Sequence, residues 1–227
     1  MLLTQNAFLA TAGDRNVVWI NPAKVEYSTG TKWPVGRHKL GQLNRILPTP
    51  IVNLFKAAIK HREPFLIPSK HFGTEAQVAQ TVRYKKVIDF IQNKENVSQS
   101  LWYQDLLQAL NQNGIAHHKN IQMHSDADIQ LFLRDYVGGL VNSMQTNGYK
   151  DPNSGYESTA VINQKGVICK SGSGNHRFCI SKALNLDRFP LRIVGIHENW
   201  PMVEKLRPGL TAESIINLLP EIEARHR

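Results

Sequence analysis

The stretch Lys170-Ser-Gly-Ser-Gly-Asn-His-Arg-Phe178 follows a short apolar hairpin and precedes an expected helix over residues 178–184. A strand, a glycine-rich turn and a helix start together suit an anion, because glycines let backbone N–H groups approach a ligand closely. The first turn of a helix adds unpaired N–H donors and a partial positive charge, and Arg177 adds a planar cation suited to phosphate or carboxylate. The pattern is also typical of an ordinary turn, and it matches neither Gly-x-x-x-x-Gly-Lys-Ser/Thr nor Gly-x-Gly-x-x-Gly.

Three short segments lie in and after this stretch: Gly174-Asn-His-Arg177, Ala183-Leu-Asn-Leu186 and Phe189-Pro-Leu-Arg-Ile-Val194. Together they resemble the central box of the ParB/sulfiredoxin superfamily. That box runs Gly-x-x-Arg, a helix with a small residue, a Leu-Gly-like turn, then Pro and a strand. The preceding segment 140–148 resembles the family's helix that ends in Gly before a strand. The resemblance covers roughly residues 125–200. It implies a ParB/sulfiredoxin-like fold with a nucleotide phosphate bound at the Gly-x-x-Arg turn.

The box departs from two branches of that superfamily in ways that bear on the reaction. Sulfiredoxin carries its cysteine nucleophile where this chain has Asn175, and chromosome-partitioning ParB proteins show Gly-Glu-Arg-Arg where this chain has Asn175 and His176. The His-Arg pair resembles the box of ParB-fold kinases that phosphorylate free serine. No helix-turn-helix segment is evident after residue 200, which counts against a partitioning role. The resemblance therefore implies phosphate binding and leaves the reaction open.

The expected site consists of the turn, one upstream lysine and a few titratable groups. Phosphoryl transfer needs anion donors, usually a divalent metal, and often a base near the accepting hydroxyl. The cofactor-binding candidates are Ser171, Gly172, Ser173, Gly174, Asn175, His176, Arg177 and Lys119, and the catalytic candidates are His176, Asp151 and Glu198. Simpler interpretations are a turn residue for Asp151, a surface charge for Glu198, a helix cap for His176 and a carboxylate partner for Arg177.

No metal site is predicted. The histidines at 117, 118 and 124 have no cysteine partner and no His-Glu-x-x-His spacing, so we expect them to face solvent around a buried Ile121 and Met123. The two cysteines, Cys169 and Cys179, do not make a disulfide framework and are expected to be buried. This cysteine usage indicates a reducing, cytoplasmic location.

The chain has 227 residues and a formal net charge of +9. Such a charge favours anionic partners, which include nucleotides, nucleic acid and anionic small molecules or glycans, although a scattered basic surface gives the same total. No apolar run approaches the ~20 residues that span a bilayer, so no membrane partner is expected. The first twelve residues lack the basic start of a signal peptide. The sequence leaves the oligomeric state open.

The expected fold class is α+β. Residues 98–227 are expected to form the ParB/sulfiredoxin-like core, and residues 1–97 a mostly helical region with short strands. Periodicity and caps predict helices over 51–60, 74–92, 98–114, 125–148 and 211–219, and strands over 16–20, 24–27, 117–124, 159–162, 167–169 and 190–196. Residues 28–41 are expected to be a loop, either an anion-binding lid or an exposed loop anchored by Trp33. Gly138 and Gly139 are expected to pack closely against another element.

The leading functional hypothesis is a nucleotide-binding enzyme that uses ATP with Mg²⁺ for phosphoryl transfer, as a kinase, or for hydrolysis. The alternative is a DNA- or nucleic-acid-binding module without turnover, which would use the basic residues around 83–86 and the loop 32–39. A nucleotide-gated binding protein is the third possibility.

Overall fold

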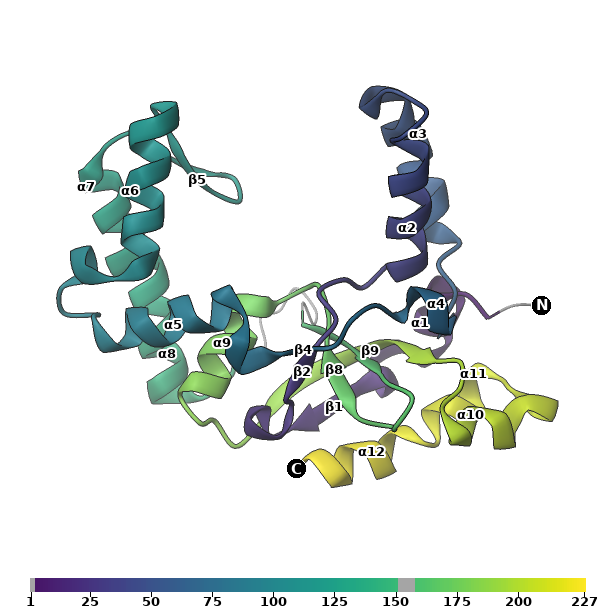
Figure 1. Cartoon of the computed structure of the whole chain (residues 1–227). Coiled ribbons are helices and arrows are strands. Elements are labelled where there is room, and N and C mark those ends of the chain that lie inside the picture. The colour runs from purple at the N-terminus through teal and green to yellow at the C-terminus, as the bar shows by residue number, and fades with distance from the viewer. Residues whose placement is uncertain (1–2, 151–157) are drawn as a thin grey trace. The chain divides into compact units, whose positions relative to one another are not determined.

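The computed structural model describes residues 3–150 and 158–227 and divides the chain into two compact units (Figure 1). Unit 1 consists of Met1–Val78, Asp151–Asn175 and Asp187–Arg227, and unit 2 of Ala79–Lys150 and His176–Leu186. Unit 1 holds a mixed sheet with helices and unit 2 is mostly helical, so the α+β class is confirmed. The boundary that the sequence analysis expects between residues 97 and 98 falls inside unit 2.

The sheet of unit 1 is organised around its longest described strand, β9. In the described part of the chain it has the order β1-β9-β7-β8-β2-β4, with β3 also paired to β9. Strand β9 runs antiparallel to β1 and parallel to β7 and β3, while β8 is antiparallel to β7 and parallel to β2. The strands are β1 (Val17–Ile20), β2 (Tyr27–Ser28), β3 (Leu66–Ile67), β4 (Ala76–Gln77), β7 (Thr159–Ile162), β8 (Ile168–Lys170) and β9 (Phe189–His197).

The buried strands follow the apolar runs of the sequence. All four residues of β7 and all but one of β9 are buried, as is typical of central strands covered on both faces. The expected strands at 16–20, 159–162, 167–169 and 190–196 are thus confirmed within a residue or two. One core cluster on this sheet consists of Ile67, Phe72, Val161, Cys169 and Val194. The strand expected at 24–27 is reduced to the two residues of β2.

The helices of unit 1 correct two predictions. They are α1 (Gln5–Ala12), α2 (Pro34–Leu43), α3 (Thr49–His61), α4 (Ser69–Phe72), α10 (Pro201–Leu206), α11 (Ala212–Ile216) and α12 (Leu219–His226). Helix α3 confirms the prediction for 51–60. The expected loop at 28–41 is wrong, because α2 occupies its second half. The final helix breaks after Ile216, and the expected charged tail instead forms α12, which lies along β1 (Figure 1).

The start of α2 depends on a residue far along the chain. Glu63 is 1% exposed, and its carboxylate accepts hydrogen bonds from the backbone N–H of Val35 at 2.9 Å and of Gly36 at 2.6 Å. Burial raises the pKa of Glu63, whereas these two N–H groups oppose that change. A carboxylate at this place satisfies donors that α2 cannot pair internally. The sequence close to residue 34 gives no indication that Glu63 caps this helix.

Unit 2 consists of helices and one short hairpin. The elements are α5 (Val82–Gln92), α6 (Leu101–Asn113), β5 (Ala116–His118), β6 (Ile121–Met123), α7 (Asp126–Leu131), a π-helical segment η5 (Phe132–Gly138) and α8 (Gly139–Asn147). Helix α9 (Asn175–Ala183) begins at the last residue of unit 1 and continues in unit 2. Helix α6 confirms the helix expected over 98–114, with Ser100 as the cap at its start and Gly114 in the left-handed conformation at its end.

Two predictions in unit 2 are corrected. The helix expected from Thr74 starts at Val82, where the Thr81 side chain accepts from the N–H of Tyr84, and residues 76–77 form β4 instead. The strand expected over 117–124 is the β5–β6 hairpin, with Lys119 at positive φ in its turn. The chain takes a tight turn here because two short strands can pair with each other, whereas a single exposed strand would leave its backbone unpaired.

The predicted helix over 125–148 is one helical run with a π-helical middle. A Cβ on Gly138 would lie 3.4 Å from the Leu133 carbonyl oxygen and 3.9 Å from Cζ of Phe90, so this glycine does lie against another helix. A Cβ on Gly139 would meet nothing within 4 Å. The expectation of close packing is therefore confirmed for Gly138 and wrong for Gly139.

Candidate functional site

The turn after β8 is organised from the inside by Lys170. This lysine is only 2% exposed, and its ammonium donates to the carbonyl oxygens of Thr159 at 3.1 Å and Ser171 at 2.5 Å. It also donates to the Ser173 carbonyl and, at 2.9 Å, to Oδ1 of Asn175. A buried ammonium is stable only when it is well paired, and here oxygens from both sides of the turn surround it. The turn is therefore folded around a cation that the protein itself supplies.

This arrangement fixes the direction of the backbone N–H groups. In a planar trans peptide the N–H points opposite to the carbonyl of the same peptide unit. The Ser171 and Ser173 carbonyls point at Lys170, so the N–H groups of Gly172 and Gly174 point away from it. These two N–H groups are therefore directed to the side of the turn opposite to the Lys170 ammonium. This is the geometry that anion binding by a backbone turn requires.

Gly174 is irreplaceable at this place for a steric reason. Its φ is +67°, and a Cβ there would lie 2.0 Å from Oγ and 2.6 Å from Cα of Ser158. Gly172 is also tight, since its Cβ would lie 3.2 Å from Cα of Thr31 and from the backbone nitrogen of Lys32. The turn is packed against residue 158 on one side and the segment 30–32 on the other.

The remaining residues of the expected turn site lie in the first turn of α9. The Nδ2 atom of Asn175 donates to the Gly172 carbonyl at 3.3 Å, so the Asn175 side chain links Lys170 to the turn. His176 and Arg177 follow directly and are half-buried. The division between the two units passes between Asn175 and His176.

The two carboxylates proposed as bases have different outcomes. Oε1 of Glu198 accepts from the backbone N–H of Ser69 at 2.7 Å and from its hydroxyl at 3.0 Å. These hydrogen bonds lower the pKa of Glu198, the backbone N–H having the largest effect, and place the carboxylate at the start of α4. Asp151 lies outside the described residues.

A hollow of about 400 Å³ in unit 2 contains His176 in its wall. Arginine and lysine from α5 and histidines from the β5–β6 hairpin and α9 line it, together with an indole and aliphatic groups. The lining residues are Val82, Arg83, Lys86, Trp102, Asp105, Leu106, Ala109, His117, His118 and His176. Sequence reasoning singled out His176 and the basic residues of α5 separately, and it did not predict that they meet.

Stacked rings form one wall of this hollow. The rings of His176 and Trp102 are stacked with centroids 5.1 Å apart, and those of His176 and His118 are also 5.1 Å apart. His118 further contacts Phe132 at 4.9 Å, so the expectation that it faces solvent is wrong. Met123 is buried as expected, whereas Ile121 at the other end of the short strand β6 is 38% exposed.

Burial, together with positive neighbours, lowers the pKa of the His176 and His118 imidazoles. Burial, followed by the charges of His118, Arg83, Lys119 and Lys86, lowers the pKa of His176 to about 4. Burial and the charges of Lys119 and Arg83 also lower the pKa of His118. At neutral pH His176 therefore offers one neutral N–H donor, and Lys119, itself exposed in the hairpin turn, adds its charge to the cluster.

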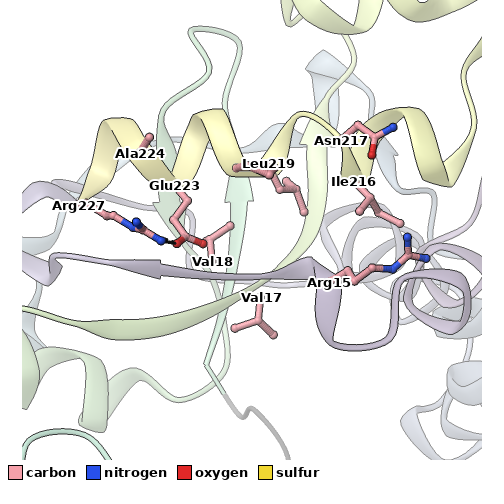
Figure 2. A pocket seen from close by; sticks show the side chains of 10 residues that line it. Arg15, Val17, Val18, Ile216, Asn217, Leu219, Glu223, Ala224 and Arg227 are labelled. Carbon is pink, nitrogen blue, oxygen red and sulfur yellow. Dashed lines mark hydrogen bonds and ion pairs between the residues drawn. The ribbon is translucent and has the colours of Figure 1, made fainter.

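A second hollow, of about 570 Å³, lies in unit 1 between β1 and the helices α11 and α12 (Figure 2). Its arginines are already paired. Arg15 contacts Glu213 at 2.7 Å, and Arg227 forms an ion pair with Glu223 four residues earlier. Because these charges are compensated, this hollow lacks the unpaired charge that would attract an ionic ligand.

Neither cysteine lies in an environment that favours a reactive thiolate. Cys169 is fully buried, and burial raises the pKa of its thiol to about 12, while Cys179 is 4% exposed. The expectation that both are buried is confirmed. Across residues 3–150 and 158–227, no group of three or more His, Cys, Asp or Glu side chains is arranged to hold a metal ion.

No helix among the described residues has the length and apolar character needed to cross a membrane. Comparisons with protein-family models, curated proteins and solved structures find no match for this chain. The resemblance to the ParB/sulfiredoxin superfamily therefore rests on the sequence of the box at 174–194.

Proposed function

We propose that this chain is a nucleotide-binding protein with a ParB/sulfiredoxin-like core, and that the turn from Ser171 to Arg177 holds the nucleotide phosphates. The observation that carries the proposal is the Lys170-centred turn, whose Ser171 and Ser173 carbonyls face the ammonium and whose glycine N–H groups point away from it. Phosphate oxygens are strong acceptors for such N–H groups, and a helix start adds favourable partial charge. Arg177 keeps the phosphate-contacting role that the resemblance implies.

The order of elements around the turn supports the same proposal. Strand β8 leads through the turn into α9, and β9 then returns parallel to β7 beside it in the sheet. This is the sequence of strand, Gly-x-x-Arg turn, helix and strand that the box resembles. The start of α9 thus follows directly on the carboxyl end of β8, and this strand runs antiparallel to β7.

The reaction that we propose is phosphoryl transfer or hydrolysis with ATP and Mg²⁺, as the resemblance implies. The turn fits the phosphates, whereas the described residues show no preformed metal cluster. Mg²⁺ in nucleotide enzymes is held largely by the phosphates and one or two carboxylates, so it would enter with the nucleotide. Glu198 is engaged at the start of α4, so His176 and Asp151 stay the other catalytic candidates.

A thermal-shift series tests the proposal. Wild type, Arg177→Ala and Arg62→Ala are each heated with ATP, ADP, CTP or GTP, with and without Mg²⁺. A nucleotide present at about 100 times its dissociation constant adds roughly 2.7 kcal/mol of stability. We expect one nucleotide to raise the midpoint of wild type and of Arg62→Ala, whose arginine lies on the exposed end of α3, and to leave Arg177→Ala unshifted. Absence of a shift with every nucleotide would sink the proposal.

The hollow in unit 2 favours a second candidate function, single-stranded nucleic-acid binding without turnover. Proteins of that kind combine stacked aromatic rings with a basic surface, because bases stack on rings and phosphates pair with cations. Trp102, His118 and His176 supply the rings, and Arg83 supplies a cation at the same hollow.

A further inference from the structure

A third hollow, of about 450 Å³, lies in unit 1 between the segment 29–31, one face of α2 and the short helix α4. Its lining residues are Thr29, Thr31, Pro34, Arg37, His38, Gly41, Gln42, Arg45, Lys70, His71, Phe72 and Gly73. Its volume is in the range of small-ligand sites. None of these residues belongs to the turn 171–177, although Thr31 lies beside Gly172 of that turn.

The charge of this hollow is of one sign. Arg37 and Arg45 are eight residues apart and therefore lie on the same face of the helical segment that α2 begins. Lys70 adds a third cation from α4, and no Asp or Glu is among the lining residues. The rings of His38 and His71 lie 4.7 Å apart, one from each side. Like charges gathered around a hollow repel one another unless an anion lies between them.

Two buried polar atoms at this hollow have no hydrogen-bond partner among the described residues. They are Oγ1 of Thr29 and Nδ1 of His71, and both residues line the hollow. Buried polar atoms are almost always paired, and each exception calls for an explanation. A small anion that reaches the base of this cationic hollow would give both atoms a partner.

The electrostatics of His71 support the same conclusion. Burial, followed by the charges of His38, Lys70 and Lys39, lowers its pKa. Glu198 has the opposite effect on His71, but it is the weakest of these influences, and its oxygen is already hydrogen-bonded to Ser69. A bound anion would add negative charge beside His71 and would allow both rings to donate hydrogen bonds to it.

We propose that this hollow binds a small polyanion of the phosphomonoester or diphosphate class, held by Arg37, Arg45 and Lys70 at the rim and by Thr29 and His71 at the base. The ligand is small because the cations surround a hollow of limited volume instead of following a long surface track. The inference stands on residues other than those of the proposed function and does not depend on it.

Calorimetric titration of the whole chain with inorganic pyrophosphate, without Mg²⁺, tests the inference. We expect saturable binding at one site in wild type and in Arg62→Gln. Replacing Arg37 and Arg45 together by glutamine removes two charge-assisted contacts, so the affinity should fall by about tenfold or more. Thr29→Val gives a sharper test, because it removes the unpaired hydroxyl at nearly constant volume. It should weaken pyrophosphate binding while leaving the unliganded protein at least as stable as wild type.

Three outcomes would overturn the inference. The first is no binding of pyrophosphate by wild type. The second is affinity that is retained in the Arg37→Gln, Arg45→Gln double variant but lost in Arg177→Ala, which would place the pyrophosphate at the turn of the proposed function. The third is binding of oligonucleotides alone, with none of pyrophosphate, which would make this face a nucleic-acid surface.

Discussion

Lys170 shows how one residue can set the shape of a candidate site. The sequence indicates a glycine-rich turn that suits an anion, but a lysine in front of such a turn would ordinarily be assigned to the ligand. The structure turns its ammonium inward, where it binds the carbonyls of Thr159, Ser171 and Ser173. Sequence reasoning identified the turn and missed its organiser, because the direction of a long side chain is decided by packing and not by local pattern.

Replacing Lys170 by methionine tests this role. Methionine keeps an unbranched side chain but removes every donor, so the carbonyls around it lose their partner. We expect the free energy of unfolding to fall by at least about 1–3 kcal/mol, the cost of leaving a buried acceptor unpaired. Urea denaturation measures the change. Lys165→Met, in the exposed β7–β8 turn, serves as the control and should leave the midpoint unchanged. Equal midpoints for the two variants would contradict the inward role of Lys170.

His176 predicts a pH dependence of stability. Its folded pKa of about 4 lies below the ordinary value of 6.5, so the unfolded state binds a proton more readily than the folded state. Its contribution to stability is therefore present above pH 6.5 and is lost as the pH falls toward 4. His176→Phe keeps a ring against Trp102 without a titrating group. We expect its urea midpoint to fall less than that of wild type between pH 7 and pH 5.

The exposed His124 provides a control for the pH experiment. His124→Phe should follow wild type across the same range. If His176→Phe loses as much stability as wild type on acidification, the burial and positive neighbours of His176 do not govern the acid side of the stability curve.

At the level of elements, the run α7–η5–α8 contains a matched pair of glycines. Both have helical backbone angles, with φ of −62° for Gly138 and −58° for Gly139. Gly139→Ala should raise the free energy of unfolding by about 0.5–1 kcal/mol, because alanine loses less backbone entropy on folding and nothing lies within 4 Å of its Cβ. Gly138→Ala should gain less, since its Cβ meets the Leu133 carbonyl and Phe90. Thermal denaturation compares the two, and equal gains would contradict this assignment.

The helices that sequence predicts well are those with local start and stop signals. Ser100 and Gly114 bound α6, and both signals lie within the helix's own sequence. Helix α2 could not be predicted from local sequence, because the residue that caps it, Glu63, lies far along the chain. For α5, Thr74 and Thr81 are equally good cap residues in sequence, and the pairing of residues 76–77 with β2 decides between them.

At the scale of the whole molecule, the charge of +9 makes salt a test of the second candidate function. Binding of a single-stranded oligonucleotide should weaken linearly on a logarithmic salt scale, with a slope of about −0.7 for each phosphate contact. Arg83→Gln should make the slope less steep by about 0.7, whereas Arg134→Gln, an exposed arginine on η5, should not. Fluorescence anisotropy between 50 and 200 mM NaCl measures both slopes. An unchanged slope for Arg83→Gln would remove the hollow in unit 2 from any nucleic-acid contact.

The architecture could be predicted only where contacts are local. The β7–β8 hairpin follows from its own turn residues, whereas the pairing of β1 with β9 joins segments that no short-range pattern connects. The same limit applies to the hollows. Arg37, His38 and His71 carry no common motif, and they meet only because α2 and α4 lie together in the fold.

The central place of β9 has a consequence for how the chain is made. Strand β9 pairs with β1, β3 and β7, all of which leave the ribosome before it. At translation rates of about 5–20 residues per second, the interval between the synthesis of β1 and that of β9 is on the order of ten seconds or more. During that interval the nascent chain carries strand edges that invite pairing with other chains. The sheet of unit 1 is therefore completed only after β9 has been synthesised, and until then the unfinished chain must stay apart from its neighbours.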